Sequence, residues 1–76
     1  MVGKVYNRFK ILLAEKEIDK EGKINYEDIS DITGIAASTL SKWATNTVTR
    51  YDRKTIAALC DYLDCNVGDL IVYERD

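Results

Sequence analysis

Residues 26–43 read YEDISDITGIAASTLSKW, and this stretch decides the fold. It predicts a short helix, a tight turn and a second helix. Gly34 stands where the first helix has to end, in a left-handed backbone conformation that is costly for residues with a Cβ. Five apolar residues of the two helices and the turn are expected to face inward: Ile29, Ile32, Ile35, Leu40 and Trp43.

With those positions assigned to packing, the outward face of the second helix consists of Ala37, Ser38, Ser41 and Lys42. This face is short-chained and polar, carries one cation and contains no carboxylate. A helix with such a face can enter the major groove of DNA, whose walls are lined by phosphates. The same pattern also fits a generic helical hairpin with a small polar surface, and the pattern alone does not separate the two.

Three helix starts share one local signature, an N-capping residue followed by a helix and flanked by an apolar pair placed as in a hydrophobic staple. The caps are Asn25, Asp52 and Asn66. The first is expected to begin a helix over about 26–33, the second a helix with an apolar stripe along one face, and the third a short turn of helix over 67–70.

The two ends of the chain complete the arrangement. Val5, Phe9, Leu12 and Leu13 recur with helical spacing, and the polar run 19–23 predicts that this first helix ends near Glu17. Residues 71–73, IVY, have the composition of a short strand. Its obvious partner is the opening segment 2–6, although the edge of a second chain could serve instead.

The sequence therefore predicts an all-α fold of five helices, with a small two-stranded ribbon formed by the chain ends. Seventy-six residues suffice for one domain, so we expect a single helix-turn-helix domain over 1–76, with the helix-turn-helix unit at about 26–45.

Charge is unevenly distributed along a chain whose net charge is only −2. Residues 35–54 hold four basic residues and one acid, whereas residues 55–76 hold five acids and one base. A molecule with one cationic stretch and an acidic remainder can bind a polyanion with one face. Ordinary solvated surface is the other interpretation of the same charges.

Catalysis finds no support in the sequence. The chain has no His to act as a base near neutral pH, and its four glycines are dispersed rather than gathered in a phosphate-binding loop. Cys60 and Cys65 have no third or fourth partner for a zinc site and are expected to be small buried apolar residues. We therefore expect a protein that is not an enzyme and has no cofactor and no metal. No run is apolar enough to span a bilayer, and the start lacks the core of a signal peptide, which predicts a cytoplasmic protein.

Two stretches in the right order resemble a known family. The run Ile32-Thr33-Gly34-Ile35 followed by Ser38-Thr39-Leu40-Ser41-Lys42 is similar to the core of the Cro/repressor-type, or XRE-like, helix-turn-helix family, and residues 51–70 are similar to the ending of its compact bacterial and phage members. The resemblance covers roughly residues 4–73. It implies a five-helix lambda-repressor-like domain that binds operator double-stranded DNA, usually as a symmetric homodimer, and acts as a transcriptional regulator and repressor. It implies no small-molecule ligand domain.

The resemblance also implies which residues meet DNA, with a recognition helix over about 36–45. Base contacts fall on Ala36, Ala37, Ser38 and Lys42, and phosphate contacts fall on Tyr26, Thr39 and Ser41. The loop that tracks the DNA backbone corresponds to Asn46, Thr47, Thr49 and Arg50. The chain departs from the family at Tyr26, where Gln is frequent, and at Ala36, where Ser often caps the recognition helix.

An alternative is a protein-binding adaptor or an antitoxin-like module that has the same fold but does not bind DNA. The acidic terminal segment favours this alternative. The dimer surface also stays open at this point. The candidates are the outer face of the last helices, with Tyr62, Val67 and Leu70, and the edge of segment 71–73. A monomer that pairs only on DNA is equally compatible with the sequence.

Overall fold

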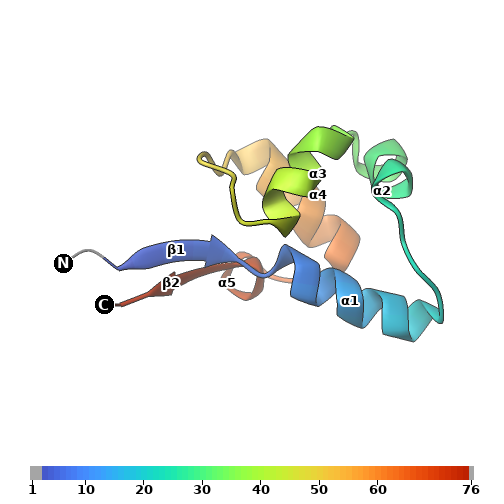
Figure 1. The fold of residues 1–76 in the computed structure, drawn as a ribbon, viewed down its shortest axis with the longest axis horizontal. Helices are drawn as coiled ribbons and strands as arrows, with labels where there is room; N and C mark the ends of the chain where they lie inside the picture. Colours follow the sequence, from blue (N-terminus) through green and yellow to red (C-terminus); the bar gives the residue numbers. More distant parts are fainter. Residues whose placement is uncertain (1–2, 76) are drawn as a thin grey trace.

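The computed structural model describes residues 3–75 of the chain. Five helices lie between two short strands, and the strands bring the two ends of the chain together (Figure 1). In chain order the elements are β1 (Lys4–Asn7), α1 (Phe9–Lys20), α2 (Tyr26–Thr33), α3 (Ala37–Ala44), α4 (Arg53–Leu63), α5 (Val67–Leu70) and β2 (Ile71–Glu74). The expected fold, all-α with a small ribbon, is confirmed.

Local signals set the bounds of α2 as the sequence predicts. The Asn25 side chain accepts a hydrogen bond from the Asp28 N–H at 2.8 Å, which caps the first turn. At the other end Gly34 has a φ of 79°, and its N–H donates to the Ser30 carbonyl. The Thr33 hydroxyl then accepts the Ile35 N–H at 3.2 Å, which fixes the turn that leads into α3.

The start of α4 follows the same rule. Asp52 accepts the Thr55 N–H at 3.0 Å, and the hydrogen bonds from Thr55 lower the pKa of the Asp52 carboxyl. At α5 the bond between cap and helix runs from the Asn66 N–H to the Asp69 carboxylate, at 3.0 Å. All three predicted starts are thus found where the caps place them.

One apolar core joins all five helices. Its fully buried members come from each helix in turn: Phe9, Ile29, Leu40, Trp43, Leu59 and Leu70. Trp43 lies at the centre, and the edge of its ring packs against Tyr51 with 5.0 Å between ring centroids. Leu40 and Trp43 therefore hold α3 against the body by its inner face.

The prediction that Ile32 faces inward is wrong. Its side chain is 69% exposed on the outer face of α2. The core side of this helix is set by Ile29 and by half-buried Tyr26 and Thr33, which lie within one sector of the helix. Ile32 lies about 90° away from the middle of that sector at the 100° per residue of an α-helix. The apolar spacing of the sequence did not reveal which isoleucine the neighbouring helices would cover.

The first helix also differs from the expectation. It begins at Phe9, because Val5 belongs to β1 and is 52% exposed, and it continues to Lys20 rather than ending near Glu17. The polar run supplies its last turn, and Glu21 closes it in the left-handed conformation with a φ of 58°. The Glu17 carboxylate accepts the Ile24 N–H at 2.7 Å, so it ties the end of α1 to the loop that follows.

The chain ends pair as an antiparallel ribbon, with Val5 opposite Tyr73 and Tyr6 opposite Val72. Val2, which the sequence analysis includes in the first strand, lies outside the described residues. The Arg8 N–H donates to the Leu70 carbonyl at 2.7 Å and continues the ladder one step toward the core. In Figure 1 the ribbon projects from one end of the molecule, whose longest dimension is 41 Å.

The two cysteines close the end of α4. The Cys65 N–H donates to the Cys60 carbonyl at 3.0 Å across Asp64, which has a φ of 53°, and this is the pattern of a Schellman motif. Both thiols are free and half-buried. Burial and the neighbouring Cys60 raise the pKa of the Cys65 thiol to about 11, so this sulfur is protonated and a weak nucleophile at neutral pH.

Candidate nucleic-acid interface

Helix α3 presents one face to the core and the opposite face to solvent. Leu40 and Trp43 are buried, whereas Ala37, Ser38, Ser41 and Lys42 are exposed. Ala36 and Thr45 lie at the N-cap and C-cap of the helix, so the expected recognition segment 36–45 corresponds to α3 with its two caps. The side chains predicted to meet bases therefore lie together on a free surface.

The N-terminal end of α3 has backbone N–H groups without a hydrogen-bond acceptor among residues 3–75. Ala36 forms no side-chain cap, and its carbonyl accepts the Thr39 and Leu40 N–H groups at 3.0 and 3.1 Å. The preceding amides of Ala37 and Ser38 find no acceptor within residues 3–75. Such first-turn amides, with the positive end of the helix dipole, favour an anion.

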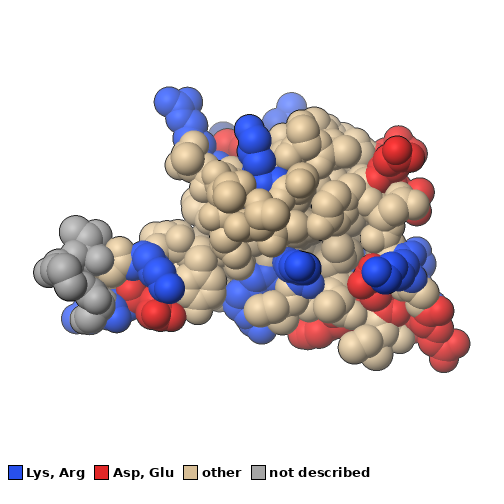
Figure 2. Space-filling model, viewed as in Figure 1, with Lys and Arg blue, Asp and Glu red and all other residues tan. Residues whose placement is uncertain are grey.

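The charges around α3 favour a polyanion. Figure 2 shows a broad area without acidic side chains over α3, edged by basic residues, while acidic side chains gather beside α2 and at the far end of α1. Within the described part of the chain the single ion pair joins Lys4 and Glu74, at 4.0 Å. Lys42 and Arg50 are therefore not neutralised by a neighbouring carboxylate and can meet phosphates.

The loop after α3 is tied down at its start and exposed at its end. The Thr45 and Thr47 hydroxyls lie 2.9 Å apart, and the Thr47 N–H donates to the Lys42 carbonyl at 2.9 Å. Thr49 and Arg50 are exposed, while Val48 between them packs on the core. Thr47, Thr49 and Arg50 are therefore exposed in the loop that directly follows α3.

Asn46 is exposed in the loop after α3, and its side chain also contacts β1. Its Oδ1 accepts the Asn7 N–H at 2.7 Å, and its Nδ2 donates to the Asn7 carbonyl at 3.2 Å. The backbone here is left-handed, with a φ of 57°, a conformation that Asn tolerates. Both polar atoms of the side chain are thus hydrogen-bonded to the backbone of β1, and Asn46 holds the loop against this strand.

Tyr26 and Thr39 are both half-buried. Tyr26 opens α2 and its ring lies 6.2 Å from the ring of Phe9, so its apolar body belongs to the core margin. Thr39 lines a shallow cavity of about 250 Å³ between the turn that follows α2 and the start of α4. The structure therefore places Thr39 at the border of the exposed face of α3, whereas the recorded contact of Tyr26 is with α1.

Two basic residues that the sequence-based set of DNA contacts does not include begin α4, and one of them lines this cavity. Arg53 and Lys54 form the first turn of α4, both exposed, and Lys54 lines the same cavity as Thr39. Cations in a first turn oppose the helix dipole, which favours acids there. The signal for them was present in the sequence, since both belong to the basic stretch 35–54.

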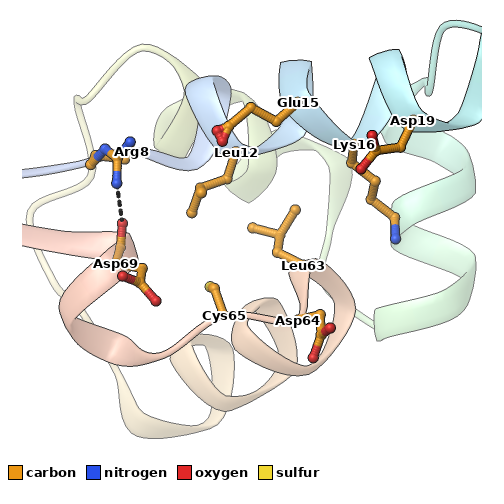
Figure 3. Close-up of a pocket in the computed structure, with 9 residues that line it drawn as sticks. All are labelled: Arg8, Leu12, Glu15, Lys16, Asp19, Leu63, Asp64, Cys65 and Asp69. Atoms are coloured by element: carbon orange, nitrogen blue, oxygen red, sulfur yellow. Dashed lines mark hydrogen bonds between the residues drawn. The ribbon is translucent and has the colours of Figure 1, made fainter.

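A larger groove lies between α1 and the segment that joins α4 to α5. Figure 3 shows Leu12 and Leu63 pointing toward each other across it, with Glu15, Asp19, Asp64 and Asp69 around them. Its volume is about 550 Å³. The two cations of its lining are engaged, because Arg8 donates to the Asp69 carbonyl at 3.3 Å and the Lys16 ammonium lies 4.8 Å from the centre of the Tyr62 ring. This acid-rimmed groove suits no nucleic acid.

Neither a metal centre nor a membrane span is found in the part of the chain that the structure describes. Residues 3–75 contain no group of three or more His, Cys, Asp or Glu side chains that could hold an ion. None of their helices is both long and apolar enough to cross a bilayer.

A comparison with protein families agrees with the helix-turn-helix geometry described above. The model of the Cro/C1-type HTH DNA-binding domain matches residues 8–76. The chain belongs to this family. Membership in the Cro/C1-type family confirms the resemblance drawn from the two sequence motifs.

Solved structures share the fold of this Cro/C1-type domain. A candidate DNA-binding protein from Bacteroides fragilis is 23% identical and superposes with a TM-score of 0.71, over 91% of this chain and 100% of that chain. The transcriptional regulator VanUg is 24% identical with a TM-score of 0.63, over 100% of this chain and 92% of that chain. At such identities the likeness concerns the fold. No curated protein sequence matches the chain.

Proposed function

We propose that this Cro/C1-type protein is a transcriptional repressor that binds operator DNA sequence-specifically, with α3 in the major groove. The observation that carries the proposal is the exposed, acid-free face of α3, held outward by the burial of Leu40 and Trp43. A protein that covers a promoter blocks transcription by occupancy alone, so repression needs no surface beyond the DNA face. We propose that the protein acts in the cytoplasm, where it would meet its operator.

The roles that we propose for the residues are those that the family resemblance implies. Ala36, Ala37, Ser38 and Lys42 read base edges, the alanines through methyl contacts such as those to thymine. Phosphate contacts come from the surrounding rim: Tyr26, Thr39, Ser41, Thr47, Thr49 and Arg50, to which we add Arg53 and Lys54. Asn46 supports this surface by orienting the loop, because its side chain is engaged by Asn7.

Direct readout by one copy is modest, since only Ser38 and Lys42 of the residues assigned to base edges have polar side chains. Two copies on a pseudo-palindrome double the number of contacts, and a recognition helix in each half-site then sits about 34 Å from the other. We therefore propose that the protein acts as a homodimer on DNA.

Salt dependence tests the proposal. With about four phosphates neutralised by the cations of one copy, log K should fall with log salt with a slope near −3.6, roughly a hundredfold loss of affinity between 50 and 200 mM. The DNA is best obtained by selecting bound duplexes from a random pool. We expect Lys42→Glu to abolish binding and to leave the fold intact, because Lys42 is exposed and forms no ion pair within residues 3–75.

Lys20→Glu is the matched control, because it makes the same charge change at an exposed position at the far end of α1. It should retain most of the binding. If both variants lose affinity equally, the interaction follows net charge and α3 has no special part in it.

A protein-binding adaptor with this fold is the second candidate function, and the acid-rimmed groove between α1 and α4 favours it. Such a module would associate with a basic partner segment and retard no duplex. Two results together would support this candidate over the repressor. The selection would yield no enriched DNA sequence, and binding to a basic protein segment would survive Lys42→Glu.

A further inference from the structure

The ribbon of β1 and β2 leaves two edges whose backbone groups can be followed one by one. The Arg8–Leu70 bond fixes the ladder, because hydrogen-bonded pairs alternate along antiparallel strands. Tyr6 and Val72 therefore face each other's backbone, whereas the N–H and C=O groups of Val5, Asn7, Ile71 and Tyr73 point away from the ribbon.

The outer edge of β1 is closed at its inner end. The Asn46 side chain supplies both an acceptor and a donor to Asn7, in the way a neighbouring strand would. What remains on this edge is Val5 and the backbone beyond it. A third strand along β1 would have to displace the Asn46 amide.

The outer edge of β2 is open. The Ile71 N–H donates to the Val67 carbonyl, but the Ile71 carbonyl, both backbone groups of Tyr73 and the Arg75 N–H have no partner within residues 3–75. Backbone groups of this kind are templates for strand addition. Tyr73 and its cross-strand neighbour Val5 are also 57% and 52% exposed, an apolar pair on a two-stranded ribbon that is marginal by itself.

We propose that the outer edge of β2 binds the same edge of a second copy of this chain, antiparallel and with the two-fold axis at Tyr73. Tyr73 of each copy then exchanges both backbone hydrogen bonds with the other, and each Arg75 N–H donates to the Ile71 carbonyl of the second copy. This gives four hydrogen bonds, whereas pairing through β1 would give two, because Asn46 occupies the rest. The inference rests on the dimer of the proposed function and names its surface.

Side chains agree with this register. The two Tyr73 rings lie directly opposite each other, with a Val5 outside each, which forms one apolar row across four strands. Glu74 lies opposite Val72 of the second copy and Arg75 opposite Ile71, so no like charges face each other. An interface in which each surface meets itself is what a two-fold dimer requires.

The position of the ribbon also suits DNA. Figure 1 places the ribbon at one end of the long axis and α3 near its middle. Two copies joined at their ribbons therefore hold their α3 helices on either side of the junction, at a separation comparable with one molecular length, 41 Å. Consecutive major grooves on one side of a duplex are ~34 Å apart.

Two proline variants test the edge. Tyr73→Pro removes the central donor of β2 and spares the ladder to β1, because its N–H points outward. Val5→Pro does the same to β1 at a similarly exposed position and is the matched control. By analytical ultracentrifugation we expect Tyr73→Pro to weaken dimerisation at least tenfold, the effect of losing two net hydrogen bonds, and Val5→Pro to change it little. The opposite order, or a wild-type chain that stays monomeric both free and on a palindromic duplex, would overturn the inference.

A crosslink keeps the test independent of proline effects on folding. With Cys60 and Cys65 replaced by Ala, Tyr73→Cys should form an intermolecular disulfide in oxidised glutathione, because Cα atoms of hydrogen-bonded antiparallel partners lie about 5.5 Å apart. Val5→Cys should not, since two strands separate the two copies of this residue. Equal crosslinking of both variants would contradict the register.

Dimerisation and DNA binding can fail separately. Tyr73→Pro should still bind a single half-site with the wild-type affinity and lose the extra affinity for the palindrome. Dimers that depend on Tyr73 in a chain that binds no duplex would refute the proposed function and support this interface.

Discussion

Asn46 shows how one side chain can join two distant parts of this chain. Its amide contacts the backbone of Asn7, 39 residues away, and Asn7 is only 4% exposed. Removing that amide would leave a buried donor and acceptor without partners, which costs more than the net value of an ordinary hydrogen bond. The loop after α3 depends on this contact for its position.

We predict that Asn46→Gly lowers the free energy of unfolding by about 1–3 kcal/mol, measured by urea denaturation. Glycine tolerates the left-handed backbone, so the loss reports the amide alone. Asn46→Asp keeps the acceptor and loses the donor, so its free energy of unfolding should lie between that of the wild type and that of Asn46→Gly. Unchanged stability in Asn46→Gly, with DNA affinity reduced as strongly as in Lys42→Glu, would instead make Asn46 a DNA contact.

At the scale of the element, α4 begins against its own dipole. Asp52 caps the helix, but Arg53 and Lys54 occupy the first turn, where acids are favoured. A sequence selected for stability alone would place a carboxylate there. Together with the cavity that Lys54 shares with Thr39, this indicates a surface that meets phosphate.

We therefore predict opposite effects of Lys54→Glu on stability and on binding. The free energy of unfolding should rise by about 0.3–1 kcal/mol, while DNA affinity falls and the salt slope becomes less steep by about 1. Urea unfolding and salt-dependent DNA titration measure the two effects. Lys54→Gln, which removes the charge without reversing it, should give the same change of slope and a smaller gain in stability. A slope that stays at the wild-type value in both variants would exclude Lys54 from the interface.

At the scale of the whole molecule, charge and shape divide the surface by function. The acid-free side carries α3 and the basic loop, whereas acidic residues line the groove between α1 and α4 (Figures 2 and 3). This asymmetry favours an approach of DNA to the side of α3 over an approach to the acid-lined groove. The ribbon at one end then determines how two such bodies can be joined.

A fixed dimer makes the spacing of half-sites critical. Inserting about five base pairs between two selected half-sites turns one of them to the opposite side of the duplex. We expect affinity measured by titration of labelled duplexes to drop to that of a single half-site, since the second contact is no longer within reach. An insertion that leaves the affinity unchanged would mean that the copies bind independently.

The extent of each helix followed closely from the sequence wherever a local device was present. Caps and the left-handed Gly34 act within a single turn of backbone, so α2, α4 and α5 begin where Asn25, Asp52 and Asn66 place them. The family, too, could be recognised from motifs around Gly34. The DNA-contacting residues and the extent of the single domain over 1–76 stay predictions.

The tertiary structure decided what depends on neighbours distant in the chain. Which isoleucine of α2 is covered, where α1 starts, and what Asn46 binds are set by elements that meet only after folding, because burial and long-range hydrogen bonds are properties of packed surfaces. The sequence by itself thus determined the helices, their order and the exposed character of α3. Only the fold decided that Ile32 is exposed, that the loop is anchored on β1, and that one edge of the ribbon is closed while the other stays open.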